Sequence, residues 1–229
     1  MTKRALHLMT SHASLSNTGR GTGLYYDEME APFRPIRDQS GDVTLALVAG
    51  GAKLPDPKIL VEPDKRPPNI ARFMDDTPEM DALQTTAKAA EIKGTDYNYN
   101  LLPGGYGAMW DFDIKPIDDI VTEAWAAGEI LDAVCHGPAG LLQAKDINDD
   151  PLVCNKRFNS FTNRETEQIE LIRVEPFLVE TRLRDARALF ECSDNLKSHA
   201  VKDGRLNHRG NPQSTETICR LLKESLEES

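Results

Sequence analysis

The stretch that decides the fold is ILDAVCHGPAGLL, residues 130–142. A short apolar run, residues 130–134, passes directly into Cys135 and then into Gly137 and Pro138, after which the pattern becomes helical. A strand that turns sharply into a helix places the residue at the turn, here Cys135, at the carboxyl end of a central strand. Open α/β sheets bind ligands at that edge. The stretch therefore predicts a parallel sheet with a thiol at its ligand-binding edge.

The rest of the chain repeats this alternation of strands and helices. Short β-like runs alternate with helical patterns, which is typical of crossover units on a mostly parallel sheet. Further strands are expected at residues 4–9, 43–48, 98–102, 154–161, 188–191 and 200–203, and helices at residues 78–91, 117–127, 176–187 and 211–226. Another helix starts near residue 23, and Pro32 and Pro35 are expected to disrupt or end it. We predict a three-layer α/β sandwich in one domain, residues 1–229, with a surface insertion around residues 52–77.

Composition and charge exclude several classes of protein. The 229 residues are 39% hydrophobic and 28% charged, which is typical of a globular chain and not of a disordered or fibrous one. The net charge of −10 repels phosphate backbones and anionic lipid, so neither a nucleic-acid nor a membrane partner is expected. No apolar run approaches the roughly 20 residues that span a bilayer, and the start shows no signal-peptide pattern.

Only one of the four cysteines has a setting suited to a nucleophile. The four are widely spaced without a metal-binding pattern, which is typical of reduced thiols, so a cytoplasmic location and no metal site are expected. A helix that begins after Gly137 should lower the pKa of Cys135 and favour the thiolate. The alternative for Cys135 is a buried structural thiol. Cys154, Cys192 and Cys219 lack such a turn and are expected to pack.

A glycine turn follows the strand expected at residues 98–102. Gly104 and Gly105 offer backbone N–H groups that no side chain obstructs, so they predict an oxyanion hole, and Tyr106 is a candidate for substrate binding. The alternative is a tight turn that needs glycine for a positive φ. The separate GRGTG run at residues 19–23 lacks the GxGxxG spacing, so no nucleotide cofactor is expected.

Four segments, in the same order along the chain, resemble the DJ-1/ThiJ/PfpI superfamily and in particular its Hsp31-like branch. They are TGLYYDE with a following PF (residues 22–28 and 32–33), LPGGYGAMWD (residues 102–111), AVCHGPA (residues 133–139), and DGRL with NP (residues 203–206 and 211–212). The resemblance implies a flavodoxin-like fold of the class I glutamine amidotransferase-like kind without a cofactor. Members of the family are commonly dimers, so a homodimer is expected.

The resemblance also assigns roles to individual residues. Cys135 becomes the nucleophile, Glu28 the acidic residue that meets it from the first helix, and His136 the third catalytic group. A carboxyl group beside a thiolate shares a proton with it, because two close negative charges are costly, and this prepares Glu28 for general acid/base catalysis. Without the resemblance, Glu28 reads as a solvated helix residue and His136 as a buried core histidine.

The acid that orients His136 is expected in the segment FTNRETE, residues 161–167, where Glu165 is our candidate after a one-residue shift of the alignment. Two positions depart from the Hsp31-like pattern. Tyr106 replaces the usual histidine of the glycine turn, and His208 stands where a threonine is usual, so no function is carried over to His208.

The resemblance implies an enzyme that acts on small reactive 2-oxoaldehydes such as methylglyoxal, without glutathione or metal. The thiolate of Cys135 adds to the aldehyde, Glu28 moves a proton through an enediol, and hydrolysis releases a 2-hydroxy acid. Two alternatives remain open. The same nucleophile can serve an amidase or peptidase-like hydrolase, or the protein is a holdase chaperone or a stress protein that responds to thiol oxidation.

Overall fold

The structure is a computed structural model that describes residues 3–38, 41–52, 66, 68–75, 77–192, 199–210 and 220. The main sheet contains β1 (Arg4–Met9), β2 (Asp42–Leu47), β3 (Ala87–Lys88), β4 (Tyr99–Leu102), β5 (Ile130–Val134), β8 (Ala200–Asp203) and β9 (Leu206–Arg209). A two-stranded sheet contains β6 (Arg157–Phe158) and β7 (Leu189–Phe190). The α-helices are α1 (Tyr26–Asp38), α2 (Pro68–Asp75), α3 (Thr77–Ala82), α4 (Ala108–Asp111), α5 (Lys115–Ala127), α6 (Asn163–Gln168) and α7 (Val179–Asp185). Short 3₁₀ turns are η1 (Ser16–Thr18), η4 (Ala89–Glu91), η5 (Gly94–Asp96) and η6 (Gly137–Leu141).

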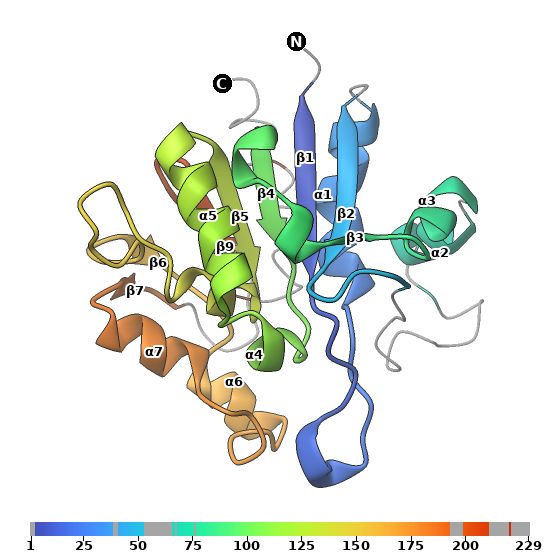
Figure 1. Cartoon of the computed structure of the whole chain (residues 1–229). Helices are drawn as coiled ribbons and strands as arrows, with labels where there is room; N and C mark the ends of the chain where they lie inside the picture. The colour runs from blue at the N-terminus through green and yellow to red at the C-terminus, as the bar shows by residue number, and fades with distance from the viewer. Residues whose placement is uncertain are drawn as a thin grey trace.

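The main sheet has seven strands in the order β3-β2-β1-β4-β5-β9-β8. Its strands run parallel except β8, which is antiparallel to β9. In Figure 1, α4 and α5 lie in front of the sheet and α1 lies behind it. This is the predicted three-layer sandwich with a flavodoxin-like, mostly parallel sheet, and the fold class is confirmed.

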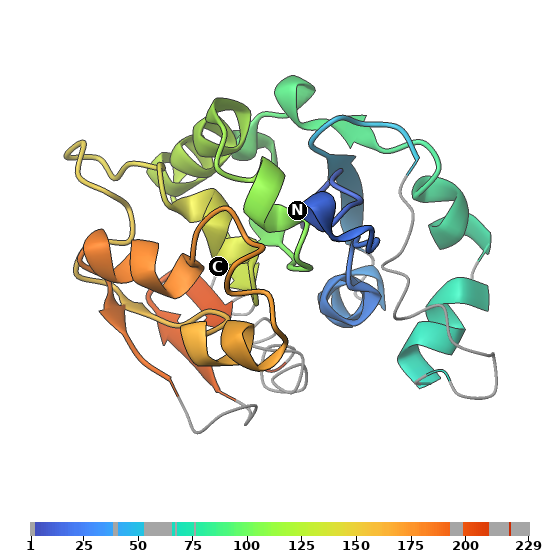
Figure 2. The same ribbon diagram turned by 90° about the horizontal axis from the view of Figure 1, so that it is seen from below.

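The central strands form because nearly every residue in them is buried on one face or the other. All five residues of β5 and five of the six residues of β1 are buried, as expected for parallel strands covered on both faces. β4 and β5 are paired in parallel, with Leu102 opposite Ala133. The two strands therefore end together, and this places the glycine turn after β4 beside Cys135. Figure 2 looks at this edge of the sheet from below.

The first helix differs from the expectation. α1 does not end at Pro32 or Pro35 but continues through both to Asp38. A proline inside a helix removes one N–H···O=C bond, yet helix stability in proteins comes mostly from packing. Phe33 and Ile36, on either side of Pro35, are buried against the sheet, which compensates for the missing hydrogen bonds.

Two short strands and one short helix also differ from the expected pattern. The helix expected at residues 78–91 ends at Ala82 and gives way to β3, because pairing with β2 at the sheet edge outweighs the helical pattern. The strand β9 lies in a stretch for which we expected none, and it forms an antiparallel hairpin with β8 around Gly204, whose φ is 62°. The expected helix after Gly137 is only the five-residue 3₁₀ turn η6.

Parts of two sequence expectations fall outside the described residues. Most of the insertion expected around residues 52–77 is not described, whereas α2 within it buries Ile70 and Phe73 in a cluster with Tyr26 and Phe33 of α1. The helix expected at residues 211–226 lies outside the described residues apart from Arg220. Within the described part of the chain, no helix combines the length and apolarity needed to cross a membrane.

Candidate active site

Cys135 sits on a strained turn between β5 and η6. Its φ of 57° lies in the left-handed region, which a residue with a side chain adopts at a cost of order 1 kcal/mol or more. Gly137, two residues later, packs so tightly that a Cβ atom there would lie 1.9 Å from the carbonyl oxygen of Leu102. The glycine therefore allows the turn to press against the end of β4, and the sequence prediction of a sharp strand-to-helix turn is reproduced in the geometry.

Glu28 meets the thiol from the first turn of α1, as the resemblance implied. Its side chain is buried and makes a hydrogen bond to Cys135. The backbone N–H of Gly104 donates to Oε2 of Glu28 at 2.9 Å and fixes the carboxyl group. A Cβ at Gly104 would lie 2.6 Å from that oxygen and 2.7 Å from Cβ of Cys135, so only glycine leaves room for the carboxyl group beside the thiol.

The pKa of the Cys135 thiol is raised, in contrast to the lowering expected from a helix N-terminus. Burial is the largest cause, followed by the nearby carboxyl groups of Glu28 and Glu165 and the hydrogen bond to Glu28. A hydrogen bond from the backbone N–H of Gly105 acts in the opposite direction but is outweighed. The five-residue η6 has too few aligned peptide dipoles to compensate. Cys135 and Glu28 thus form a buried pair in which the sulfur keeps its proton until a base removes it.

The imidazole of His136 lies next to the sulfur. Its Nδ1 lies 3.3 Å from Sγ of Cys135, and its Nε2 lies 3.2 Å from Oε1 of Glu175. The side chains of His136 and Glu175 have no exposed surface. An acid at one ring nitrogen orients the imidazole and stabilises its positive charge when the other nitrogen takes a proton. Cys135, His136 and Glu175 therefore lie next to one another in this order.

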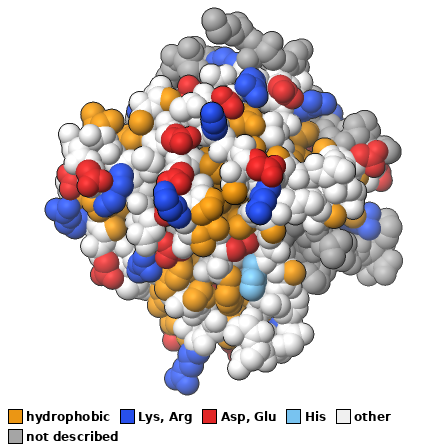
Figure 3. Space-filling model, viewed as in Figure 1, with side chains coloured by type: hydrophobic (Ala, Val, Ile, Leu, Met, Phe, Trp, Pro, Cys, Tyr) orange, Lys and Arg blue, Asp and Glu red, His pale blue; other side chains and the backbone are white. Residues whose placement is uncertain are grey.

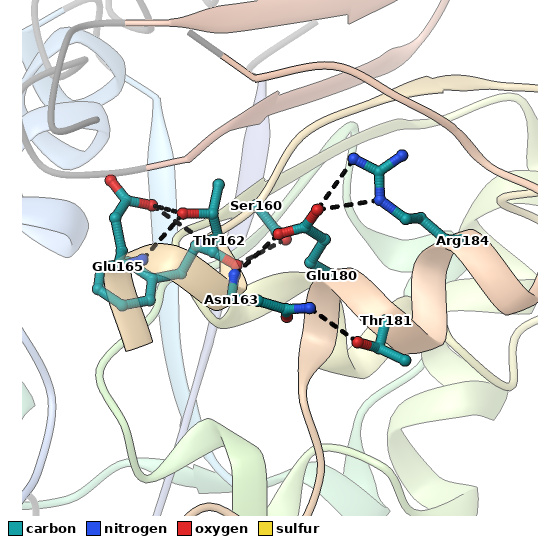
Figure 4. A network of polar contacts seen from close by, with 8 residues as sticks. Ser160, Thr162, Asn163, Glu165, Glu180, Thr181 and Arg184 are labelled. Carbon is teal, nitrogen blue, oxygen red and sulfur yellow. Dashed lines mark hydrogen bonds and ion pairs between the residues drawn. The ribbon is translucent and has the colours of Figure 1, made fainter. Parts of the chain in front are cut away.

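The structure places Glu175, and not the expected Glu165, beside Nε2 of His136. Glu165 is the third residue of α6, and its side chain turns back to accept hydrogen bonds from the N–H and hydroxyl of Thr162, both at 2.8 Å. Figure 4 shows this capping contact. Glu175 comes instead from the segment between α6 and α7. One signal for it was present in the sequence, since it is an isolated acid in the otherwise apolar run VEPFLV, residues 174–179.

The glycine turn contributes only part of the expected oxyanion hole. The N–H of Gly104 is occupied by Glu28, while the N–H of Gly105 faces the sulfur. Gly105 has a φ of 100°, and a Cβ there would lie 2.3 Å from the carbonyl oxygen of Gly23, so both the functional and the tight-turn explanations apply. Of these two glycines, Gly105 is the donor that faces the sulfur.

Aromatic rings enclose the imidazole of His136. The ring of Tyr106 meets it edge-on at 5.3 Å, and the ring of Phe161 lies 4.6 Å away at an angle of 34°. The N–H of Phe161 also donates to the carbonyl oxygen of Cys135 at 2.9 Å, which ties this segment to the elbow. Tyr106 is half-buried and therefore lies at the boundary between the site and solvent.

Comparisons with known proteins bear on the fold and the family of the chain. No protein-family model matches the chain. The crystal structure of APC35852 is 31% identical and superimposes with a TM-score of 0.88 over 100% of this chain and 99% of that one. Glyoxalase 3 of Candida albicans is 25% identical over 93% of this chain and 94% of its own. The glutathione-independent glyoxalase HSP31 of Saccharomyces cerevisiae is 27% identical over 70% of this chain and 69% of its own. Drosophila melanogaster DJ-1beta, 16% identical, shares the fold with a TM-score of 0.59 over 98% of this chain and 91% of its own.

The chain belongs to the DJ-1/ThiJ/PfpI superfamily, in its Hsp31-like branch.

The two departures from the Hsp31-like pattern lie in different surroundings. Tyr106 contacts the site through His136, as described above. His208 lies in β9, where its ring stacks on Phe158 at 4.0 Å and its Nδ1 accepts a hydrogen bond from the N–H of Asn159. It is fully buried as part of this packing, and burial lowers its pKa to about 3. His208 is therefore a neutral core residue, and Tyr106 is the departure that bears on function.

The described residues hold no group of three or more His, Cys, Asp or Glu side chains arranged to bind a metal ion. The polar groups that surround Cys135 are instead a carboxyl group, an imidazole and a backbone N–H. These groups can move protons and stabilise charge. The chemistry that this part of the chain can supply is nucleophilic addition with general acid/base catalysis.

Proposed function

We propose that this protein is a glutathione-independent glyoxalase-type enzyme, which converts small 2-oxoaldehydes such as methylglyoxal into 2-hydroxy acids. The observation that carries the proposal is the convergence on one sulfur of a buried carboxyl group, Glu28, and an imidazole, His136. A nucleophile alone serves many reactions, but a separate carboxyl group beside it is what an internal proton transfer requires. The names of Glyoxalase 3 and of HSP31 support the same reaction class.

In the first step the sulfur of Cys135 adds to the aldehyde carbon. His136 takes the thiol proton through Nδ1 while the C–S bond forms, and the proton then passes to the aldehyde oxygen, giving a hemithioacetal. Glu175 stabilises the transient imidazolium. The raised pKa of the thiol makes this base necessary, because little free thiolate is present at neutral pH.

In the second step Glu28 relocates a proton along the substrate. Its carboxylate removes the hydrogen from the former aldehyde carbon, which gives an enediol, and then returns a proton to the neighbouring carbon. The product is a thioester of the 2-hydroxy acid on Cys135. The hydrogen bond from Gly104 holds the carboxyl group in place through both transfers. Water then cleaves the thioester, so that one 2-oxoaldehyde and one water give one 2-hydroxy acid and the free thiol.

The test is a substrate screen with the wild-type protein and the Cys135→Ala variant, in the absence of glutathione. Methylglyoxal should yield lactate with the wild type only. Simple amides should not be hydrolysed, and suppression of aggregation of a client protein should not depend on Cys135. Amide hydrolysis without lactate would favour the hydrolase, and loss of client protection in Cys135→Ala without turnover of either substrate would favour the redox-responsive chaperone.

Two further expectations belong to this proposal. We expect a homodimer, which light scattering coupled to size-exclusion chromatography tests directly. We also expect a cytoplasmic location, since reduced cysteines such as the exposed Cys192 persist in a reducing compartment. Fractionation of cells that express the tagged protein at its natural level tests the location.

A further inference from the structure

Two aromatic rings from different segments of the chain pack against the imidazole of His136. Tyr106 comes from the turn after β4, and its ring centroid lies 5.3 Å from that of His136. Phe161 comes from the segment between β6 and α6, and its ring centroid lies 4.6 Å from that of His136. The rings of Tyr106 and Phe161 also meet each other edge to face at 6.5 Å. The three rings therefore form one cluster next to the nucleophile.

The polar contacts of His136 fix its orientation only in part. The terminal torsion of a histidine side chain has a broad preference. Nε2 lies 3.2 Å from Oε1 of Glu175, but Nδ1 faces the sulfur of Cys135 at 3.3 Å, and a thiol is a weak hydrogen-bonding group. The rings of Tyr106 and Phe161 contact the imidazole itself. They therefore restrict the rotation that would carry Nδ1 away from the sulfur.

The two rings also suit the positive charge that His136 acquires in the proposed reaction. A cation within about 6 Å of the centroid of an aromatic ring is attracted by the electrons of the ring, and both rings lie within this distance. Elsewhere arginines take such positions, Arg205 over Trp125 at 4.2 Å and Arg184 over Phe190 at 4.5 Å. On the face that Figure 3 shows, charged side chains of both signs lie among apolar ones at the surface. The side chain of His136 has no exposed surface, so the protein and not water must stabilise its charge.

We propose that Tyr106 is a positioning residue, which together with Phe161 holds the imidazole of His136 against the sulfur while the thiol proton is transferred. The inference rests on the proposed function, because it concerns the base that prepares the nucleophile. Phe161 is buried in one cluster with Cys135, so its substitution would also disturb the packing of the turn. Tyr106 is half-buried and can be changed at a smaller cost in folding. Variants of Tyr106 therefore test the proposal.

The first measurement is the rate at which iodoacetamide alkylates Cys135, relative to the exposed Cys192 of the same molecules. The thiolate is the species that reacts, so an imidazole displaced from the sulfur slows the reaction. Tyr106→Leu keeps an apolar side chain but removes the ring, and we expect it to lower the relative rate about fivefold or more. Tyr106→Phe keeps the ring and should stay within about twofold of the wild type. Phe190→Leu, which removes a half-buried ring from β7, is the control and should leave the rate unchanged.

A double-mutant cycle tests whether Tyr106 acts through His136. Two residues of which one acts through the other have effects that do not add. In a His136→Gln background, which has no imidazole to position, Tyr106→Leu should not slow the alkylation of Cys135 any further. An equal slowing in both backgrounds would overturn the proposal. Faster alkylation in Tyr106→Leu would also overturn it, because the ring would then only cover the thiol.

Steady-state kinetics with methylglyoxal give a second test, which does not depend on the folding of His136→Gln. A misplaced base lowers kcat, whereas a lost substrate contact raises KM. We expect Tyr106→Leu to lower kcat about tenfold or more with KM within about twofold of the wild type, and Tyr106→Phe to keep kcat. A change confined to KM would overturn the proposal. Failure of the proposed function looks different: the wild type does not convert methylglyoxal to lactate, while the alkylation rates still follow the expected pattern.

Discussion

The two halves of the site are built by different means. The half that holds the nucleophile, at the ends of β4 and β5, depends on backbone contacts: a positive φ at Cys135 and two glycines that touch neighbouring carbonyl oxygens. The half that holds Glu165 and Glu175, around α6 and α7, depends on side-chain contacts with Thr162 and His136. In the first half, a Gly→Ala substitution would place a methyl group against main-chain atoms. In the second half, a Glu→Gln substitution replaces a carboxylate by an amide of the same shape.

Substitutions in the two halves of the site therefore test different properties, folding in the first half and chemistry in the second. Changes in the backbone-built half should lower the free energy of unfolding and abolish activity together. Changes in the half built from side chains should alter activity while the fold persists.

The largest effect is expected for Gly137→Ala. The added Cβ would lie 1.9 Å from the carbonyl oxygen of Leu102, and backbone cannot give way as a flexible side chain does. The free energy of unfolding should fall by about 3 kcal/mol or more, and turnover should be lost. Gly128→Ala is the matched control, because Gly128 ends α5 with a φ of 92° and open space around its Cβ. It should cost only about 1 kcal/mol and leave activity intact. Urea unfolding and turnover of both variants decide the matter.

Glu175→Gln tests the half of the site that depends on side-chain contacts. The amide keeps the shape of the carboxyl group but cannot stabilise an imidazolium, so His136 becomes a poorer base. We expect kcat to fall about 10²-fold while the protein keeps its near-UV circular dichroism. Glu170→Gln, at an exposed position of the same segment, should behave as the wild type. A loss of folded protein in Glu175→Gln would place Glu175 in the structural half instead.

Two buried histidines outside the candidate site allow a test of how the free energy of unfolding depends on pH. Burial lowers the pKa of His7 and of His208 to about 3. In the unfolded chain both titrate near 6.5, so the unfolded state binds more protons between these values. Their stabilisation is therefore complete above about pH 6.5 and is lost as the pH falls, by about 1.4 kcal/mol per pH unit for each histidine. Urea unfolding at several pH values should show a shallower dependence in His208→Asn, and an unchanged slope would contradict neutral burial.

The smallest effect is expected for Thr162→Val. The change removes the hydroxyl that caps α6 and one of the two donors to Glu165, but the backbone N–H of residue 162 remains. The free energy of unfolding should fall by about 1 kcal/mol, with kcat for methylglyoxal little changed. A large loss of turnover would mean that the contact of Thr162 with Glu165 matters for catalysis.

The same division explains what the sequence could predict. β1 and β5 were predicted with their observed bounds because buried parallel strands are continuous apolar runs. Cys135, Gly104 and Gly137 lie in local motifs whose spacing fixes their geometry. Glu175 stands out as an isolated acid in an apolar run, but its contact with His136 depends on the path of the chain between α6 and α7, which that run does not encode. β3 and β9 are too short to show a period of two, and their pairing depends on neighbours distant in sequence.

The most direct test of the account is the turnover of methylglyoxal by Glu28→Gln, measured beside the rate at which iodoacetamide alkylates its Cys135. Glutamine keeps the size of the side chain and still accepts the hydrogen bond from Gly104, but it cannot take and return a proton. The account predicts that kcat falls by about 10² to 10⁴ while Cys135 is alkylated at a rate comparable to that of the wild type. Asp27→Asn, one residue earlier in α1, should keep both rates. A Glu28→Gln protein with near wild-type turnover would contradict the central claim that a carboxyl group beside the thiol moves the proton.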